Sequence, residues 1–431
     1  MIVELRVTGG DLSTTVLDHE PQPEQQSGGW PLVLALAVAQ IASWGTVYYS
    51  FSLLILPMEA ELGWTRSGIC GALSFGLLIA GLCAYGAGSW IDRHGGRWLM
   101  RAGTVLASLM LAAWSQVHTL SALYLIWAGL GVAMAATLYE SVFVVLTRSF
   151  PQSFRTRITV LTLVAGFAST IFMPLTEILV QSQGWRGALM ILAAINLAVC
   201  LPIHALWLRD GATRARPTAP PPVDRKALLR RALRNPVFWG LALCLTAYNA
   251  TFSALTFHLI PLLAERGVGI AVAIAAVALI GPSQVAARLL IFLFARRLPT
   301  ALTGRIVLLA LPVSLALLIR FPDSTSALFL AAIYYGSANG IMTIIRSAAV
   351  PDLMWRDGYS SINGVLAFPA MAAQALSPLA AALIWSLTGG YDAVLWTLLA
   401  VSTFAAMAFW AAAALARSRP AAEAENLPAR R

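Results

Sequence analysis

The sequence predicts an all-α membrane protein in which twelve transmembrane helices form two pseudo-symmetric six-helix bundles. Three observations predict this fold class: the composition, a series of charge-free runs and an internal repeat. Of the 431 residues, 59% are hydrophobic and only 11% are charged, whereas soluble domains are about one quarter charged and less than half apolar. A water-soluble core cannot enclose so much apolar surface, so lipid is the solvent for most of the chain.

Long charge-free runs mark the spans. No Asp, Glu, Lys or Arg occurs in 25–58, 67–91, 102–139, 187–208, 235–264, 267–287, 324–345, 358–391 or 393–416. A helix needs about 20 apolar residues to cross the roughly 30 Å hydrocarbon layer. The runs are continuous rather than alternating, which indicates helices and not a barrel. The run 102–139 holds two spans, and further spans around 157–181 and 300–319 bring the count to twelve.

The basic residues predict the orientation, because an even number of spans places both chain ends on one side. That side carries 24 of the 29 basic residues, Arg288 falls inside a span, and the opposite side holds only Arg66, Arg186, Arg266 and Arg320. The positive-inside rule makes the basic side cytoplasmic. We therefore expect a cytoplasmic N-terminal tail at 1–29 and a cytoplasmic C-terminal tail at 419–431. The arginines are spread over many loops, so the net charge of +10 does not indicate nucleic-acid binding.

A basic, proline-rich segment divides the chain. We expect the first six-helix bundle at 30–208, a cytoplasmic linker at 209–234 and the second bundle at 235–418. After Asp224 the linker can form a basic amphipathic helix on the anionic inner leaflet, and a plain solvated linker explains this composition equally well.

The two halves repeat one another at an offset of 204 residues. This offset pairs Pro57 with Pro261 and Glu61 with Glu265. Such a repeat is typical of secondary transporters, whose substrate sites lie between the repeats near the bilayer midplane.

The segment 86–103, GAGSWIDRHGGRWLMRAG, forms the turn between spans two and three. Gly95 and Gly96 permit a tight reversal there. Gly86 and Gly88 are expected to let neighbouring backbones approach closely.

Charge also gathers in this turn. Arg93 and Arg97 follow the positive-inside bias, whereas Asp92 has no value for topology and is expected to have a partner. That partner is either an arginine or the N-terminal end of another helix, such as the one that opens near Asp357.

Gly88-x-x-x-Asp92-Arg93-x-Gly95-x-Arg97 resembles the signature loop of the major facilitator superfamily, with Gly96 where that pattern often has a basic residue. Segments such as GWTRSG (63–68) and GPSQVAARLL (281–290) look like a bacterial branch similar to the monocarboxylate porters and oxalate–formate exchangers. The resemblance covers about residues 30–416. It implies an inner-membrane transporter that works by alternating access, with Asp92 latching its cytoplasmic side. The second-half loop is degenerate, so the latch is expected to be one-sided.

Arg288 is the leading candidate for substrate binding. It lies about 12 Å along the helix from Arg296, and it either snorkels to the cytoplasmic surface or faces the central cavity. In the cavity its guanidinium would bind a carboxylate bidentately. The resemblance supports this role, because the similar carboxylate porters use an arginine at the matching position of span eight. Span eleven lacks the lysine that the exchangers use there, which argues against a dicarboxylate and leaves a monoanion or another kind of substrate.

Four further polar residues are candidates within the spans. Glu140 in span four is expected to be buried and to carry a proton, or else to form a structural pair with Arg148 or Arg346. Asn249 and Asn339 lie near the middle of spans seven and ten, where interhelical hydrogen bonding explains them as well as substrate contact does. Tyr48 either stacks on a ligand or packs between helices.

These features predict a secondary active transporter, not an enzyme, that moves a small organic anion together with protons. The sequence shows no nucleotide-binding loop, no nucleophile–base constellation and no metal spacing, so we expect no cofactor and no metal. We expect a monomer in the lipid bilayer that binds no nucleic acid. One alternative is a proton-coupled exporter of hydrophobic or drug-like compounds; another is a transport-dead membrane sensor or scaffold.

Overall fold

The computed structural model describes residues 29–208, 225–294, 298–354 and 359–417, and the regular structure in these ranges is helical. In the first half the helices are α2 (Trp30–Ser43), η1 (Trp44–Tyr49), α3 (Phe51–Leu62), α4 (Arg66–His94), α5 (Arg97–Ser115), α6 (Leu120–Thr137), α7 (Tyr139–Ser149), α8 (Phe154–Ala165) and α9 (Ala168–Leu206). In the second half they are α10 (Arg225–Leu233), α11 (Pro236–Glu265), α12 (Ile270–Ala278), α13 (Ile280–Phe294), α14 (Thr300–Arg320), α15 (Thr325–Leu353), α16 (Tyr359–Thr388) and α17 (Tyr391–Arg417).

These helices make twelve membrane spans. Ten stretches in the described part of the chain are long and apolar enough to cross a membrane. One of them, Thr156–Leu206, has 51 residues, or about 76 Å of helix, which is more than twice the hydrocarbon thickness. It breaks at Gly184, where φ is 69° and ψ is 168°, and so supplies two spans. The shorter helix α5 packs against α6 and α9 and is the twelfth span.

Side-chain caps begin several of the spans. Thr65 accepts a hydrogen bond from the backbone N–H of Gly68 at the start of α4, and Thr119 does the same for Ala122 at the start of α6. Asn235 caps α11, whose first residue is a proline. These residues satisfy N–H groups that a helix leaves unpaired, and proline has none to satisfy at that position.

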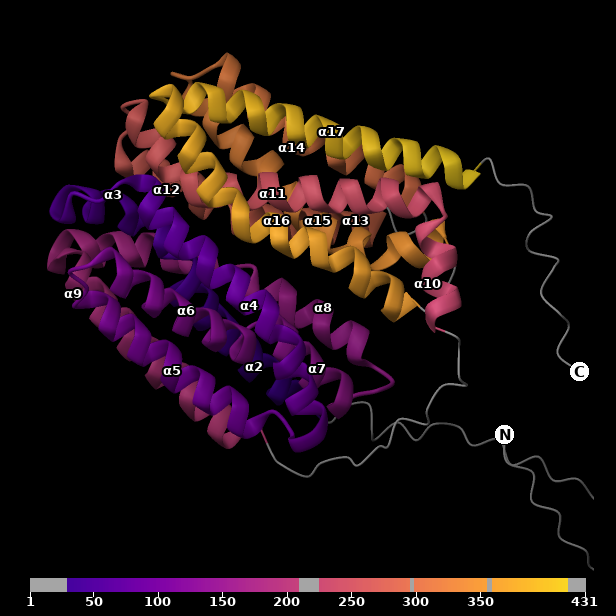
Figure 1. The fold of residues 1–431 in the computed structure, drawn as a ribbon, viewed down its shortest axis with the longest axis horizontal. Coiled ribbons are helices and arrows are strands. Elements are labelled where there is room, and N and C mark those ends of the chain that lie inside the picture. Colours follow the sequence, from indigo (N-terminus) through magenta and orange to yellow (C-terminus); the bar gives the residue numbers. More distant parts are fainter. Residues whose placement is uncertain (1–28, 209–224, 295–297, 355–358, 418–431) are drawn as a thin grey trace, which may run out of the picture.

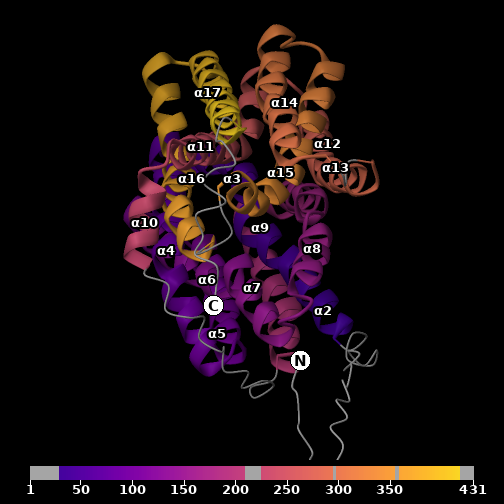
Figure 2. The same ribbon diagram turned by 90° about the vertical axis from the view of Figure 1, so that its right-hand side faces the viewer.

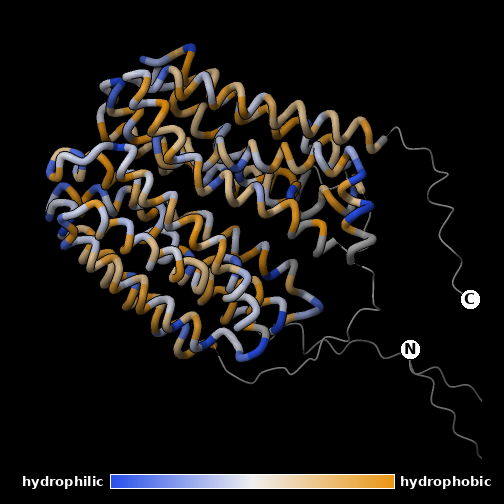
Figure 3. Tube along the Cα trace, viewed as in Figure 1, coloured by the Kyte–Doolittle hydropathy of each residue, from blue (hydrophilic) through white to orange (hydrophobic). Residues whose placement is uncertain are grey.

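The two halves form separate bundles that lie side by side (Figures 1 and 2). They meet mainly along α4 and α16, along α3 and α11, and along α9 and α12. Hydrophobic residues cover most of the helices, and hydrophilic residues gather at the turns (Figure 3). We call the end of the molecule where α10 lies the linker end, and the opposite end the far end. Twelve spans return the chain to the end at which α2 began.

The predicted repeat is visible in the helix crossings. A Cβ atom on Gly131 of α6 would lie 2.3 Å from the carbonyl oxygen of Gly76 on α4. In the second half, a Cβ atom on Gly336 of α15 would lie 2.5 Å from the carbonyl oxygen of Ile280 on α13. Gly76 and Ile280 are 204 residues apart, so the same close crossing occurs in both bundles.

The repeated glutamates, Glu61 and Glu265, accept hydrogen bonds from the start of the last span in their own bundles. Glu61 accepts hydrogen bonds from the side chains of Trp185 and Arg186 at the start of the sixth span. Glu265 accepts the backbone N–H of Tyr391 at 3.0 Å, at the start of the twelfth span. Each carboxylate therefore ties the beginning of the last span to its own bundle at the far end.

Candidate transport pathway

Span one carries an aromatic cluster at its π-helical segment, a type of distortion that is frequent at functional sites. The ring centroids of Trp44 and Tyr48 lie 4.9 Å apart, and those of Trp44 and Tyr139 lie 5.0 Å apart. Tyr48 also lies 4.7 Å from Phe257 on α11 and therefore joins the two halves. Since Tyr48 is only 2% exposed, its ring packs between helices in this conformation.

Span eight is broken by its own sequence. Pro282 has no N–H to offer the carbonyl of Ala278 four residues earlier, and the helix breaks between α12 and α13. Thr170 of the first half donates its hydroxyl to this carbonyl at 2.8 Å. The break thus creates a polar contact between the two halves.

Arg288 lies on α13 beyond this break. Its Nε donates to the carbonyl of Gly340 on α15 at 2.8 Å, and one terminal nitrogen donates to the carbonyl of Thr162 on α8 at 3.0 Å. The side chain is 8% exposed. Arg288 therefore bridges the two halves between the helices and does not snorkel to the membrane surface.

The surroundings of Arg288 are aromatic rather than acidic. Tyr49, Tyr139 and Tyr248 lie close enough to interact with it electrostatically, and they come from spans one, four and seven. Among the described residues, none of the ion pairs involves Arg288. A guanidinium inside the membrane normally has a partner, because an isolated charge there costs about 2.5–3.5 kcal/mol on insertion scales.

A small cavity lies between the halves near this arginine. Its lining includes Tyr49 and Ser169 from the first half and Thr256, Gln284 and Tyr335 from the second. Its volume of about 20 Å³ is enough for a water molecule and little more. In this conformation the two halves are therefore packed together at this level.

Two asparagines and a glutamate occupy different surroundings. Asn249 donates to the carbonyl of Leu245 in its own helix at 2.8 Å, and Asn339 is half-buried on α15.

The prediction that Glu140 is buried is wrong. Span four breaks at Leu138, and Glu140 is exposed in the first turn of α7. Its expected pairing with Arg148 or Arg346 is absent among the described ion pairs.

The turn after α4 has the predicted reversal. Gly95 has a φ of 86°, a left-handed conformation that favours glycine. Arg93 is exposed and Arg97 is half-buried, whereas the side chain of Asp92 lies outside the described part of the structure. A Cβ atom on Gly96 would lie 2.5 Å from Val145 of α7, so no basic side chain fits there.

The two other glycines of this segment do not have the expected role. Nothing lies within 4 Å of a Cβ atom on Gly86, and a Cβ atom on Gly88 would make ordinary contact with Val144 at 3.7 Å. The predicted close approach of backbones at this point is therefore wrong. It occurs instead three turns earlier on α4, at Gly76.

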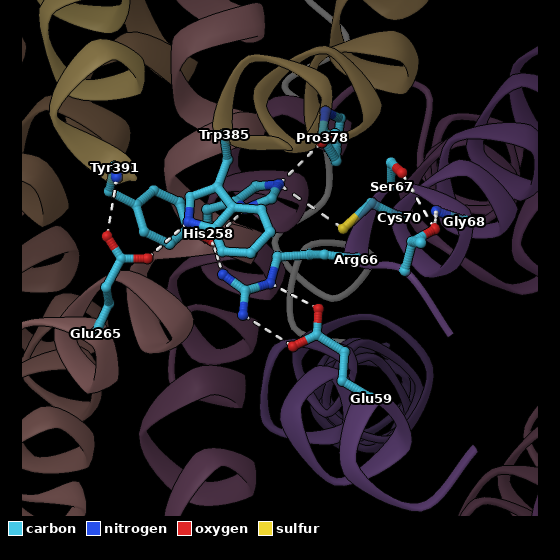
Figure 4. A network of polar contacts seen from close by, with 11 residues as sticks. Glu59, Arg66, Ser67, Gly68, Cys70, His258, Glu265, Pro378, Trp385 and Tyr391 are labelled. Carbon is cyan, nitrogen blue, oxygen red and sulfur yellow. Dashed lines mark hydrogen bonds and ion pairs between the residues drawn. The ribbon is translucent and has the colours of Figure 1, made fainter. Parts of the chain in front are cut away.

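A polar network at the far end joins the two halves (Figure 4). Glu59 and Arg66 form a two-pronged ion pair, with N–O distances of 2.7 and 2.8 Å. Another guanidinium nitrogen of Arg66 donates to the hydroxyl of Tyr391 on α17 at 3.2 Å, and the guanidinium lies 4.0 Å from the ring centroid of Trp385. The network continues through His258 on α11.

The sequence carries one signal for this network. Arg66 is one of only four arginines expected at the far end, and a buried arginine there needs a carboxylate. Its partners in the second half are far away in sequence, and Tyr391, for example, is 325 residues away. Only the packing of α4 against α16 shows that they meet.

Comparison with known proteins agrees with this architecture. The family model for the Major Facilitator Superfamily matches residues 36–378. Monocarboxylate transporter 13 of Rattus norvegicus is 24% identical over 364 residues, which cover 78% of this chain and 77% of that protein. The uncharacterized MFS-type transporter YcxA of Bacillus subtilis is 24% identical over 353 residues, with coverages of 79% and 85%. Monocarboxylate transporter 11 of Mus musculus is 31% identical over 261 residues, with coverages of 58% and 57%.

Two solved structures show the same fold. A bacterial homologue of the human lysosomal transporter Spinster, in an inward-facing and unoccupied conformation, has a TM-score of 0.69 at 15% identity, covering 92% of this chain and 98% of that chain. A variant of the nucleoside transporter NupG has a TM-score of 0.72 at 18% identity, with coverages of 89% and 99%.

Proposed function

This chain belongs to the Major Facilitator Superfamily, and on that premise we propose that it is a secondary active transporter of a small organic monocarboxylate, coupled to protons. The observation that carries the proposal is Arg288, a buried arginine between the two halves with no carboxylate partner among the described residues. A substrate carboxylate supplies the missing negative charge. The monocarboxylate transporters among the relatives support this substrate class.

The charge balance favours a monoanion. One carboxylate neutralises one guanidinium, and its two oxygens match the guanidinium fork. A second carboxylate would remain without a cation, since span eleven offers no lysine. The tyrosines near Arg288 provide apolar rings and hydroxyl donors for the rest of a small substrate.

The contacts of Arg288 also connect binding to movement. Its bond to Thr162 crosses from one half to the other, so an anion that engages the same guanidinium competes with an interbundle contact. We propose that the linker end faces the cytoplasm, and that Asn249 and Asn339 contact the substrate in the open states. The motif residues Gly88, Asp92, Arg93, Gly95 and Arg97 would then control closure at the linker end, and the transporter acts as a monomer in the bacterial inner membrane.

A thermal-shift series on the purified protein tests the substrate class. Lactate and benzoate are expected to raise the melting midpoint, whereas succinate and the cation tetraphenylphosphonium are expected to leave it unchanged. A ligand at 100 times its Kd stabilises a protein by about 2.7 kcal/mol. Stabilisation by the cation and by neither monocarboxylate would contradict the proposal and favour an exporter of hydrophobic compounds.

Glu140 is the proposed proton site, in spite of its exposure in this conformation. Replacing Glu140 by glutamine is expected to abolish uptake driven by a pH gradient and to spare exchange of substrate across the membrane, because exchange moves no net proton. Glu177→Gln is the matched control, since Glu177 is a partly exposed glutamate that accepts a hydrogen bond from Gln181 on its own helix. Proton-driven uptake that survives in Glu140→Gln would exclude Glu140 from this role.

A further inference from the structure

We propose that His258 is a proton-binding site that controls the closure of the far end, and that protonation of its imidazole opens this end. The inference rests on the proposed alternation between two conformations, but not on the anion or on Glu140. His258 lies on α11 of the second half and is 1% exposed. It is placed where helices of both halves meet (Figure 4).

The hydrogen bonds of His258 identify its neutral form. Nε2 lies 2.9 Å from the carbonyl of Pro378, which can only accept, so Nε2 carries the hydrogen. Nδ1 lies 2.7 Å from the hydroxyl of Tyr391. That hydroxyl oxygen accepts from Arg66 at 3.2 Å, and its own hydrogen is then free to be donated to Nδ1. Each of the three hydrogen bonds that lead from Arg66 through Tyr391 and His258 to Pro378 then has one donor and one acceptor.

A second proton on His258 breaks this arrangement. Nδ1 would become a donor that faces the hydroxyl of Tyr391, whose hydrogen would then lose its acceptor. The new positive charge would also lie only one hydroxyl group away from the guanidinium of Arg66. Like charges at this separation repel, and the repulsion is strong where water is excluded.

The other charged groups around His258 do not remove this conflict. Glu59 on α3 already holds Arg66 with both carboxylate oxygens. Glu265 lies two turns beyond His258 on the same helix, about 10 Å along its axis, and it accepts hydrogen bonds from Trp385 and Tyr391. Cys70 on α4 lies 3.7 Å from Nε2 and is neutral as a thiol. α16 contributes Pro378 and the indole of Trp385 to this network.

Because the closed far end disfavours the imidazolium, proton binding favours the state in which the far end is open. In that state His258 and Tyr391 separate from Arg66 and water solvates the imidazolium. An acidic medium at the far end would then promote opening on that side. The effect is expected near neutral pH, because a solvated histidine titrates there.

Cys70 is a reporter for this opening. Its thiol is fully buried beside His258, so a water-soluble maleimide can reach it only when the far end opens. A protein in lipid nanodiscs, with Cys83, Cys200 and Cys244 replaced by alanine, would be labelled without substrate at about pH 7.5 and about pH 5.5. We expect the labelling rate, divided at each pH by the rate of free cysteine with the same reagent, to be several-fold higher at the lower pH. The division is needed because acid removes the reactive thiolate about 10-fold per pH unit, which is as much as a single proton on His258 can favour opening.

His258→Gln in this background is expected to remove the acceleration, so that the labelling rate divided by that of free cysteine no longer changes with pH. His118→Gln is the control, since His118 is an exposed histidine at the same end, and it should keep the acceleration. If His258→Gln does not fold, Tyr391→Phe keeps the imidazole but removes its link to Arg66, and it should flatten the pH profile. An unchanged profile in the folded variants, or no acceleration by acid in the parent, would overturn the proposal; failure of anion binding elsewhere would leave it standing.

Discussion

Replacing Arg288 by glutamine should lower monocarboxylate uptake roughly 30-fold or more, because removing one member of a buried charge pair costs about 2–5 kcal/mol. Glutamine keeps a hydrogen-bond donor for the carbonyl of Gly340 or Thr162 but has no charge to offer the anion. Lysine keeps the charge but not the guanidinium fork, so the uptake rate of Arg288→Lys should lie between those of the parent and Arg288→Gln. The measurement is the initial rate of benzoate uptake by proteoliposomes.

A matched control separates this effect from a general loss of arginine. Arg320 is exposed at the end of α14, where its guanidinium lies 5.7 Å from the ring centroid of Phe321. Arg320→Gln should transport like the parent. Melting curves without ligand show whether Arg288→Gln remains folded. Full uptake by a folded Arg288→Gln would exclude Arg288 as the anion site.

Replacing Glu59 by glutamine should produce the largest loss of stability among single substitutions at the far end. Arg66 is 8% exposed and Glu59 is 19% exposed, so the substitution leaves a nearly buried guanidinium without its carboxylate. Breaking a buried pair costs about 3–5 kcal/mol, and partial exposure of Glu59 reduces this to roughly 2 kcal/mol. The midpoint of thermal unfolding in detergent should fall accordingly.

Two further variants make this test specific. Asp392 is 89% exposed and pairs with Arg266 at 3.3 Å, so Asp392→Asn should leave the midpoint unchanged. Adding Arg66→Gln to Glu59→Gln removes the uncompensated charge and should restore part of the stability. Equal effects of Glu59→Gln and Asp392→Asn would show that the Glu59–Arg66 pair does not stabilise the far end.

The fold was predictable because lipid permits few solutions. The charge-free runs correspond to spans, since a backbone in hydrocarbon must satisfy its own hydrogen bonds. The offset of 204 residues, found from Glu61 and Glu265, reappears as a carboxylate that holds the start of the last span in each bundle at the far end. The turn at Gly95 was predictable as well, because two adjacent glycines between long apolar runs permit a sharp reversal.

The surroundings of individual side chains were less predictable. The burial of Glu140 depends on the break at Leu138, which has no proline to mark it, and the break turns Glu140 to an exposed position. Span eight did carry a signal in Pro282. The prediction of close backbone contacts at Gly86 and Gly88 was wrong, because a pattern of glycines does not show which helix packs against them. The pairing of Arg66 with Tyr391 and its relation to His258 depend on how two distant bundles meet.

We propose that an anion passes between the two bundles and is held by Arg288. Counterflow tests it most directly: proteoliposomes loaded with unlabelled benzoate are diluted into labelled benzoate, and transient accumulation of label is recorded without any ion gradient. We expect an overshoot of label for the parent and for Arg320→Gln, and none on the same time scale for folded Arg288→Gln. The absence of an overshoot for lactate and benzoate in the parent, or an equal overshoot in Arg288→Gln, would contradict it.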